Sequence, residues 1–239
     1  MTHPAENDKL TTAAQPPEAP KHKQAITSVD VVLLTLVDRR LYTVVVDRDR
    51  PPFEGMPTLP GGYVHTETDP DSRAAARRTL EKKTGIKAPY LEQLYTFSGP
   101  DRDPRGWSFS VAYYALVNKD TVALRMNAGA RLVPVDEVGE LGFDHNEILD
   151  FALKRLQDKS SYSALPCYLL PKEFTLTELQ ETYELVMKER LEKSSFRRKL
   201  EDMGFLEVLE GQFRTGKHRP AQLYRIRPDK SLTLFDRTV

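Results

Sequence analysis

The sequence predicts a mixed α/β chain with two folded parts, a larger α/β sandwich followed by a smaller part of helices and a β-hairpin. Two β-branched runs open the first part, amphipathic helices follow at 71–86 and 145–157, and a stretch rich in proline and serine lies at 159–173. At 239 residues the chain is long for one compact domain and sufficient for two cores. We expect a disordered tail at 1–24, a first domain at 25–158 and a second domain at 159–239.

The composition narrows the class of protein. Basic and acidic side chains number 35 each, so the whole chain carries no net charge that would indicate a nucleic-acid partner, and charge has to be examined by segment. A single cysteine, Cys167, excludes an internal disulfide framework and is expected to be a small buried residue. No apolar run is long enough to cross a bilayer or to form a signal peptide, so we expect a cytoplasmic protein without a membrane partner.

The first domain begins with a hairpin. The runs VDVVLLTLVD and LYTVVVDRD are β-branched and are separated by a short polar turn. Several prolines and Gly55 then predict a loop that leads into the helix at 71–86, which ends at Gly85. Three further strands are expected at 90–99, 107–117 and 131–138, and the apolar positions of the helix at 145–157 repeat at helical spacing. This order suits an α/β/α sandwich.

The second domain carries clear helix signals. Thr175 and Glu178 form a capping box, and Phe174 and Leu179 form a hydrophobic staple around it, so a helix begins at Thr175. A second helix is expected to be capped by Ser194 and to end at Gly204. Two alternating strands at 205–214 and 221–228 follow, joined by a polar tip. The pattern is that of a winged helix-turn-helix.

Positive charge gathers on this second domain. Residues 193–227 hold 9 basic and 4 acidic side chains, and a recognition helix offers cations and donors from its first turns to the major groove. The competing interpretation is a solvated helix face covered by a hairpin, but basic residues occur on both elements. His218 has no second histidine or cysteine nearby, which disfavours a metal site. The expected DNA-binding residues are Ser194, Ser195, Arg197, Arg198, Lys199, Arg214, Lys217, His218 and Arg219.

Residues 59–86, LPGGYVHTETDPDSRAAARRTLEKKTGI, resemble a Nudix box with its acidic residues replaced. Its arginine, apolar and glycine positions are kept at Arg78, Leu80, Gly85 and Ile86, and the loop before them is two residues longer than the box requires. In the enzymes that this motif resembles, three helical glutamates hold Mg²⁺ ions on a diphosphate. Those positions are Thr79, Lys82 and Lys83 here, so we expect no metal site, no catalytic residues and no enzyme.

The eroded box, followed by FTLTELQ, SSFRRKL and HRPAQLYR, resembles the NrtR family of bacterial transcriptional repressors of NAD metabolism. The segments DPRGWS and FDH also look like that family's signatures. The resemblance implies a Nudix-like α/β/α sandwich joined to a C-terminal winged helix-turn-helix. It further implies that the sandwich senses ADP-ribose or a related nucleotide, that no cofactor is needed, and that a homodimer binds a palindromic operator until the ligand releases it.

Several residues are candidates for holding that ligand. Lys82 and Lys83 stand where divalent cations would have been held and could neutralise a diphosphate directly, without activating water as a metal does. The alternative is that both lysines are simply solvated. Trp107 could stack on a base or be part of the core. The expected ligand-binding residues are Arg48, Gly61, Gly62, Arg78, Lys82, Lys83, Arg105 and Trp107.

Three other functions stay open from the sequence. The effector could be a sugar, as in some relatives with eroded boxes. The protein could instead be a Mg²⁺-dependent hydrolase of ADP-ribose or nucleoside diphosphates that uses Glu67, Asp69 or Asp71, which the three missing glutamates disfavour. A role in protein interaction would leave the basic run at 197–199 without a purpose.

Overall fold

A computed structural model describes residues 24–127, 129–215 and 220–230. The expectation of a disordered tail at 1–24 therefore concerns residues of which only Gln24 is described. The elements in chain order are β1 (Ile26–Val37), β2 (Arg40–Asp47), β3 (Pro57–Thr58), β4 (Gly61–Tyr63), α1 (Ser72–Thr84), β5 (Tyr90–Gly99), β6 (Ser108–Leu116), α2 (Lys119–Arg125), β7 (Ala130–Pro134), α3 (His145–Ser160), the 3-10 helix η1 (Leu165–Leu169), β8 (Phe174–Thr175), α4 (Leu176–Met187), α5 (Lys193–Met203), β9 (Leu206–Arg214), β10 (Ala221–Ile226) and the 3-10 helix η2 (Pro228–Lys230).

One mixed sheet forms the centre of the first part. Its main path runs β3-β2-β1-β6-β5, with β4 paired to β1 and β7 paired to β2. The neighbours β1 and β6 run parallel in an unbroken register from Ile26 opposite Ser108 to Leu34 opposite Leu116, and the other pairs are antiparallel. The predicted opening hairpin is confirmed as β1 and β2, joined at Asp38 and Arg39, both of which have positive φ. Such a tight turn brings the first residues of β2, Arg40–Thr43, back alongside the end of β1.

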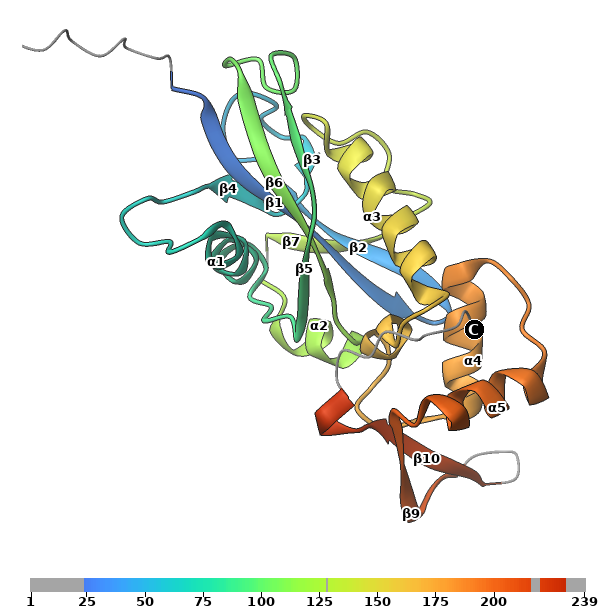
Figure 1. Cartoon of the computed structure of the whole chain (residues 1–239). Coiled ribbons are helices and arrows are strands. Elements are labelled where there is room, and N and C mark those ends of the chain that lie inside the picture. The colour runs from blue at the N-terminus through green and yellow to red at the C-terminus, as the bar shows by residue number, and fades with distance from the viewer. Residues whose placement is uncertain (1–23, 128, 216–219, 231–239) are drawn as a thin grey trace, which may run out of the picture.

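Helices cover both faces of this sheet, with α1 and α3 on opposite sides (Figure 1). Side chains alternate along β1: Val32 and Leu34 belong to the core beneath α3, whereas Val31 and Leu33 belong to the core beneath α1 and α2. Because both faces are buried, the middle of the strand is apolar at every position from Val31 to Leu34, as is typical of a central strand. The expected α/β/α sandwich is confirmed.

The helix α1 begins and ends as its sequence predicts. The Asp71 side chain accepts a hydrogen bond from the N–H of Ala74 and caps the N-terminus, and Gly85 ends the helix in the left-handed conformation. The helix α2 was not expected; Asn118 caps it, and Val122 anchors it in the core beneath α1. Seven residues give too short an apolar period to distinguish from a loop.

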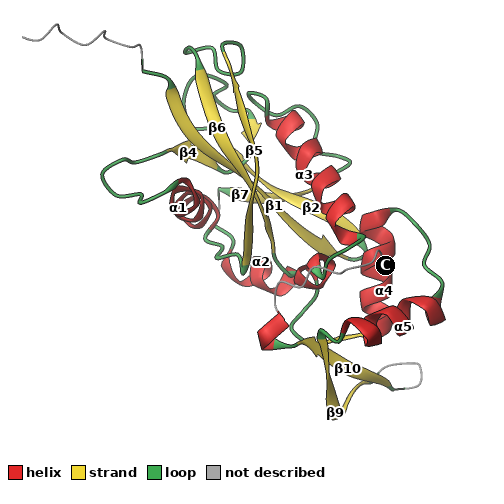
Figure 2. Ribbon diagram, viewed as in Figure 1, coloured by secondary structure: helices red, strands yellow, loops and turns green. Residues whose placement is uncertain are grey.

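The second part holds α4, α5 and a three-stranded sheet of order β8-β10-β9, drawn beneath the sandwich in Figure 2. The capping box at Thr175 and Glu178 is confirmed, and Gly204 ends α5 with a positive φ. Phe174, Leu179, Tyr183, Phe196 and Leu200 gather in one core. Cys167 is buried beside them, and burial raises the pKa of its thiol. The expected helix-turn-helix and hairpin are present.

The predicted cap of α5 was wrong. The helix begins two residues earlier than expected, after Glu192, whose carboxylate accepts hydrogen bonds from the N–H groups of Ser194 and Ser195. Ser194 lies inside the first turn and donates its own hydroxyl to Glu192. A carboxylate satisfies two free N–H groups at once and favours the positive end of the helix dipole, so Glu192 is the better cap.

The two parts are packed against each other. Leu165 and Leu169 of η1 and Val186 of α4 belong to the same buried cluster as Tyr114 of the sheet. Gln157 near the end of α3 donates a hydrogen bond of 3.0 Å to the carbonyl oxygen of Met187, the last residue of α4. At the tip of the opening hairpin, Arg39 forms an ion pair of 2.7 Å with Glu181 of α4.

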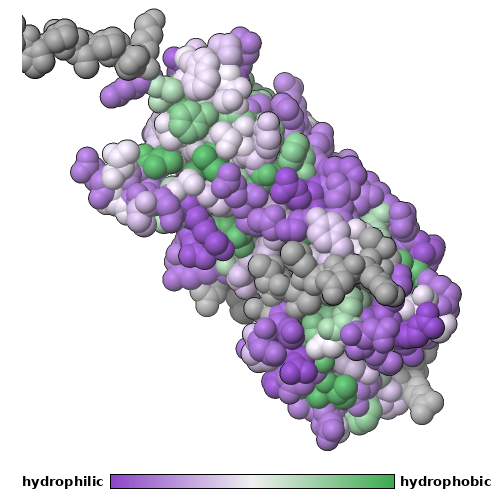
Figure 3. All heavy atoms as spheres, viewed as in Figure 1, coloured by the Kyte–Doolittle hydropathy of each residue, from purple (hydrophilic) through white to green (hydrophobic). Residues whose placement is uncertain are grey.

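Among the residues that the structure describes, no helix is long and apolar enough to cross a bilayer. The face drawn in Figure 3 is mainly hydrophilic, with smaller apolar areas on both parts.

Candidate functional site

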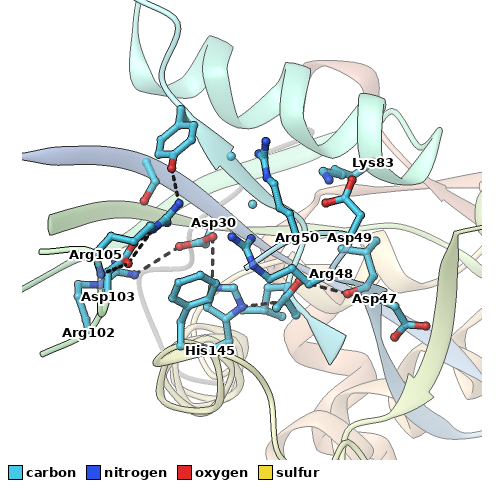
Figure 4. Close-up of a pocket in the computed structure, with 18 residues that line it drawn as sticks. Asp30, Asp47, Arg48, Asp49, Arg50, Lys83, Arg102, Asp103, Arg105 and His145 are labelled. Atoms are coloured by element: carbon cyan, nitrogen blue, oxygen red, sulfur yellow. Dashed lines mark hydrogen bonds and ion pairs between the residues drawn. The ribbon is translucent and has the colours of Figure 1, made fainter. Parts of the chain in front are cut away.

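A cleft opens at the end of the sheet where β2 finishes and α3 begins. Its walls come from β1, β2, β4, the loop after β2, the loop between β5 and β6, and the first residue of α3, and Lys83 reaches it from α1 (Figure 4). Charged side chains dominate the lining: Arg48, Arg50, Lys83, Arg102 and Arg105 are basic, and Asp30, Asp47, Asp49 and Asp103 are acidic. The chain folds these residues together from segments more than seventy positions apart.

A buried carboxylate lies at the floor of the cleft. Asp30 is 5% exposed in the middle of β1; it accepts a hydrogen bond of 2.6 Å from Ser110 and lies 3.6 Å from the guanidinium of Arg102. Burial alone would raise the pKa of Asp30, but His145, Ser110 and Arg102 together hold it below its usual value. Asp30 is therefore an ionised anchor that fixes the surrounding groups.

His145 links this anchor to the backbone. Its Nδ1 accepts a hydrogen bond of 2.9 Å from the N–H of Leu59, and its Nε2 lies 3.4 Å from Asp30. Since Nδ1 is an acceptor, a neutral imidazole carries its proton on Nε2, facing the carboxylate. The ring is consequently held in one orientation with both nitrogens occupied, which leaves it without a free site for metal.

Glycine is required beside Asp30. A Cβ added to Gly61 would lie 2.0 Å from Oδ1 of Asp30, far inside any normal contact. A Cβ on the next residue, Gly62, would meet the hydroxyl of Thr79 at 3.3 Å. The predicted glycines thus let the β4 backbone approach the charged floor closely, and Gly61 has the tighter constraint.

Arginine side chains and aromatic rings form one wall of the cleft. Arg105 donates to both carboxylate oxygens of Asp103, at 2.9 and 2.6 Å, and also to the hydroxyl of Tyr63. The Arg48 guanidinium lies 4.9 Å from the centre of the Phe143 ring and bonds to the carbonyl oxygens of Pro52 and Pro51. Burial, followed by the repulsion of Arg105 and Arg50, lowers the pKa of Arg48. Like charges held this close favour an anionic ligand between them.

The box positions do not fit a divalent cation. Thr79 is 2% exposed with no partner for its hydroxyl, Lys82 is exposed, and Lys83 lines the cleft. In the described ranges, no three histidine, cysteine, aspartate or glutamate side chains gather as metal ligands. Of the acidic residues of the preceding loop, Asp69 pairs with Arg78, Asp71 caps α1 and Glu67 is exposed. These donors do not form a magnesium site.

The predicted ligand residues divide into two groups. Arg48, Gly61, Gly62, Lys83 and Arg105 line the cleft together. The remaining three lie elsewhere: Arg78 donates to Asp69 and to the carbonyl oxygen of Tyr63, Lys82 points to solvent, and Trp107 is 52% exposed with an edge contact to Phe109.

Sequence reasoning did not name Asp30, Arg50 or Arg102 as part of this site. Arg102 donates to both oxygens of Asp144, the residue before α3, at 2.8 and 2.9 Å, and so connects the β5–β6 loop to that helix. One signal was available in the sequence: Asp30 is a lone acid within an otherwise apolar strand, and buried acids of this kind have a charged partner or a function.

The predicted DNA-binding residues are distributed over α5 and the hairpin. Arg197 and Arg198 are exposed on α5, whereas Ser195 and Lys199 are half-buried. Arg214 at the end of β9 donates a hydrogen bond of 2.9 Å to the carbonyl oxygen of Glu173 and lies 3.5 Å from Glu178. Lys217, His218 and Arg219 lie outside the described residues.

Each of the two parts of the chain matches a known protein family. The NUDIX domain family model matches residues 26–152, and the model of the NrtR DNA-binding winged helix domain matches residues 166–226. An Acinetobacter baylyi protein described as an ADPR responsive transcriptional repressor, NtrR, is 39% identical over 204 residues, which cover 84% of this chain and 81% of the relative.

Two solved structures of Shewanella oneidensis NrtR extend the comparison. NrtR complexed with a 27mer DNA matches with a TM-score of 0.82 at 35% identity, over 89% of this chain and 99% of that one. The NUDIX domain of the same protein, complexed with ADP ribose, matches with a TM-score of 0.53 at 34% identity, over 60% of this chain and 95% of that one.

Proposed function

Because this chain belongs to the NrtR family, we propose that it is a transcriptional repressor that binds operator DNA and is released from it by ADP-ribose. The observation that carries the proposal is the presence, in one packed chain, of a cleft lined by several arginines and a helix-turn-helix with a hairpin. The two ligands, DNA and ADP-ribose, are those found in the structures of the relatives named above. The chain divides at about residue 158 into a sensing part and a DNA-binding part.

The sandwich holds its ligand without cleaving it. Hydrolysis of a diphosphate needs metal ions that bridge the phosphates and activate water, and Thr79, Lys82 and Lys83 replace the carboxylates that would hold them. Arg48 and Arg105, backed by Phe143 and Tyr63, are suited to bind phosphate oxygens. The ligand then acts as an effector and no cofactor takes part.

The exposed face of α5 reads the DNA. Arg197 and Arg198 project from the second helix of the helix-turn-helix, which is the element that enters the major groove in such domains. Arg214 and the hairpin tip at 215–220 are the candidates for backbone or minor-groove contacts. Two copies of the chain, arranged as a homodimer, would present paired recognition helices to a palindromic operator, with half-sites about one helical turn apart.

A binding titration tests this function directly. The protein is titrated against the DNA upstream of its own gene, with and without ADP-ribose, while chromatography follows whether the nucleotide stays intact. We expect specific binding that falls steeply with salt and is reversed by uncleaved ADP-ribose. The double substitution Arg197→Ala and Arg198→Ala should weaken DNA binding by about tenfold or more without changing ADP-ribose affinity. Arg77→Ala, an exposed cation on α1, is the matched control.

The alternative functions give different outcomes. If DNA binding is unaffected by ADP-ribose but is released by a sugar, the effector is the sugar and not ADP-ribose. Mg²⁺-dependent cleavage of ADP-ribose without specific DNA binding would identify a hydrolase instead.

A further inference from the structure

The substitution of lysines for metal-binding glutamates affects the cleft at one position only. Of the three replaced residues, Thr79 is buried beneath Gly62 and Lys82 is exposed, whereas Lys83 lines the cleft. The sequence alone suggested that Lys82 and Lys83 act as a pair. On a helix, however, consecutive side chains point about 100° apart, so only one of them can face the sheet end.

Most charges in the cleft are already paired within the protein. Asp103 is paired with Arg105, Asp47 lies 3.3 Å from Arg131, and Arg102 is paired with Asp144. Within the part of the chain that the structure describes, the side chains of Lys83 and Arg50 make no hydrogen bond or ion pair, and Figure 4 draws them on the same side of the cleft as Asp49. Beside Arg48 and Arg105, these two cations can therefore bind an incoming anion without giving up an existing partner.

We propose that the Lys83 ammonium takes the place of a divalent cation and contacts the diphosphate of the bound nucleotide directly, so that ligand binding requires no metal. The proposal rests on the proposed function, since it assumes that ADP-ribose enters this cleft. An ammonium donates up to three hydrogen bonds to phosphate oxygens and neutralises part of their charge. It has no open coordination position at which water could be ionised, so it cannot produce the nucleophile that a bound metal supplies.

The test is calorimetric titration of the full-length protein with ADP-ribose, once in excess EDTA and once with Mg²⁺. We expect the wild-type dissociation constant to differ less than about twofold between the two buffers. Lys83→Ala should weaken binding by about tenfold to a hundredfold, the range for loss of a hydrogen bond to a charged group. Lys83→Glu should weaken it further, because a carboxylate repels the diphosphate.

Lys82→Ala discriminates between the two lysines. Both side chains are basic residues in the last turn of α1, so both substitutions remove the same small interaction with the helix dipole. Equal melting temperatures of the two alanine variants would exclude a folding defect. The structure leaves Lys82 outside the cleft, and its variant should bind ADP-ribose as the wild type does.

Two results would overturn the proposal about Lys83 and leave the proposed function intact. These are wild-type binding that requires Mg²⁺, and Lys83→Ala binding as tightly as Lys82→Ala. If the wild type bound no ADP-ribose in either buffer, the effector in the proposed function would be wrong as well, and the two failures are thereby distinguished.

Discussion

At the scale of single residues, the site depends on Asp30. Its carboxylate holds Ser110, His145 and Arg102 in place, and the β4 backbone fits around it only because Gly61 has no side chain. The sequence predicted both glycines, since they belong to a recognisable motif. It did not reveal why they are needed, because the constraint comes from a residue thirty positions away.

Gly61→Ala should destabilise the protein more than Gly62→Ala. The added methyl group would lie 2.0 Å from the Asp30 carboxylate at position 61 and 3.3 Å from the Thr79 hydroxyl at position 62. We expect Gly61→Ala to cost about 1–3 kcal/mol, as for overpacking of a filled site, and to weaken ligand binding by displacing Asp30. Urea unfolding of both variants measures this, and equal midpoints would contradict the assigned constraint.

The Asp69–Arg78 pair should make stability depend on pH. Hydrogen bonds from Arg78 lower the pKa of Asp69 from 3.8 to about 2, with a smaller contribution from the backbone of His65. Because the folded pKa lies below the unfolded one, the pair stabilises the fold fully above pH 3.8 and loses this effect as the pH falls towards 2.

Arg78→Met keeps most of the side-chain volume and removes this effect. The variant should melt at a lower temperature than the wild type at neutral pH, and the difference should shrink as the pH drops through that window. Thermal melts at a series of pH values would show it. A difference that stays constant down to pH 2 would mean that the pair does not couple proton binding to folding.

At the scale of elements, a helix or turn could be predicted from the sequence where a few neighbouring residues carry a strong signal, and not where that signal is weak or unusual. The opening hairpin, the capping box at Thr175 and the stop at Gly204 were predicted from a few neighbouring residues, and the structure confirms them. Glu192 was overlooked as the cap of α5 because serine is the commoner cap, and α2 because its apolar repeat is too short.

The helix α3 joins the two sites. Its first residue, His145, lines the ligand cleft, and sixteen residues at 1.5 Å each make it about 24 Å long. Near its far end Gln157 bonds to the last carbonyl group of α4, just before the turn that leads to α5. A rigid element anchored at both places can carry a small displacement from the cleft to α5, the helix proposed to contact DNA.

Gln157→Met should therefore weaken the coupling between ligands. It retains the side-chain size but removes the donor to Met187. We expect the ratio of DNA dissociation constants with and without ADP-ribose to fall by about 2- to 10-fold, with ADP-ribose affinity in the absence of DNA unchanged. The control is Lys154→Met, since Lys154 forms its ion pair with Asp158 on the same helix. An unchanged ratio in Gln157→Met would exclude this contact from the coupling.

At the scale of the whole molecule, the sequence predicted the two parts but not how they fit together. Proline and serine at 159–173 indicated a domain boundary, yet Leu165 and Leu169 from this stretch are buried beneath α3. Contacts that bring a short irregular segment against a distant sheet leave no periodic pattern. The charged cleft was only half predicted for the same reason, since Asp30, Arg50 and Arg102 converge from separate loops and strands.

This shared core predicts a single unfolding transition. Leu165 is 1% exposed, and Leu165→Ala should cost about 2–5 kcal/mol. In hydrogen exchange measured by mass spectrometry, peptides from both parts should lose protection together in this variant. Loss confined to the winged part would show that the two cores unfold independently.

The seam formed by η1 and the end of α4 also limits how such proteins could be recombined. Val186 is buried against the sandwich, so a winged fragment separated from the sandwich would expose the apolar face that Val186 helps to cover. Fusing the winged helix-turn-helix to a different ligand-binding domain would require, besides the peptide connection, a surface on that domain that fits η1 and α4. We therefore expect the sandwich and the winged helix-turn-helix to occur together in related proteins, with the residues of the seam changing together.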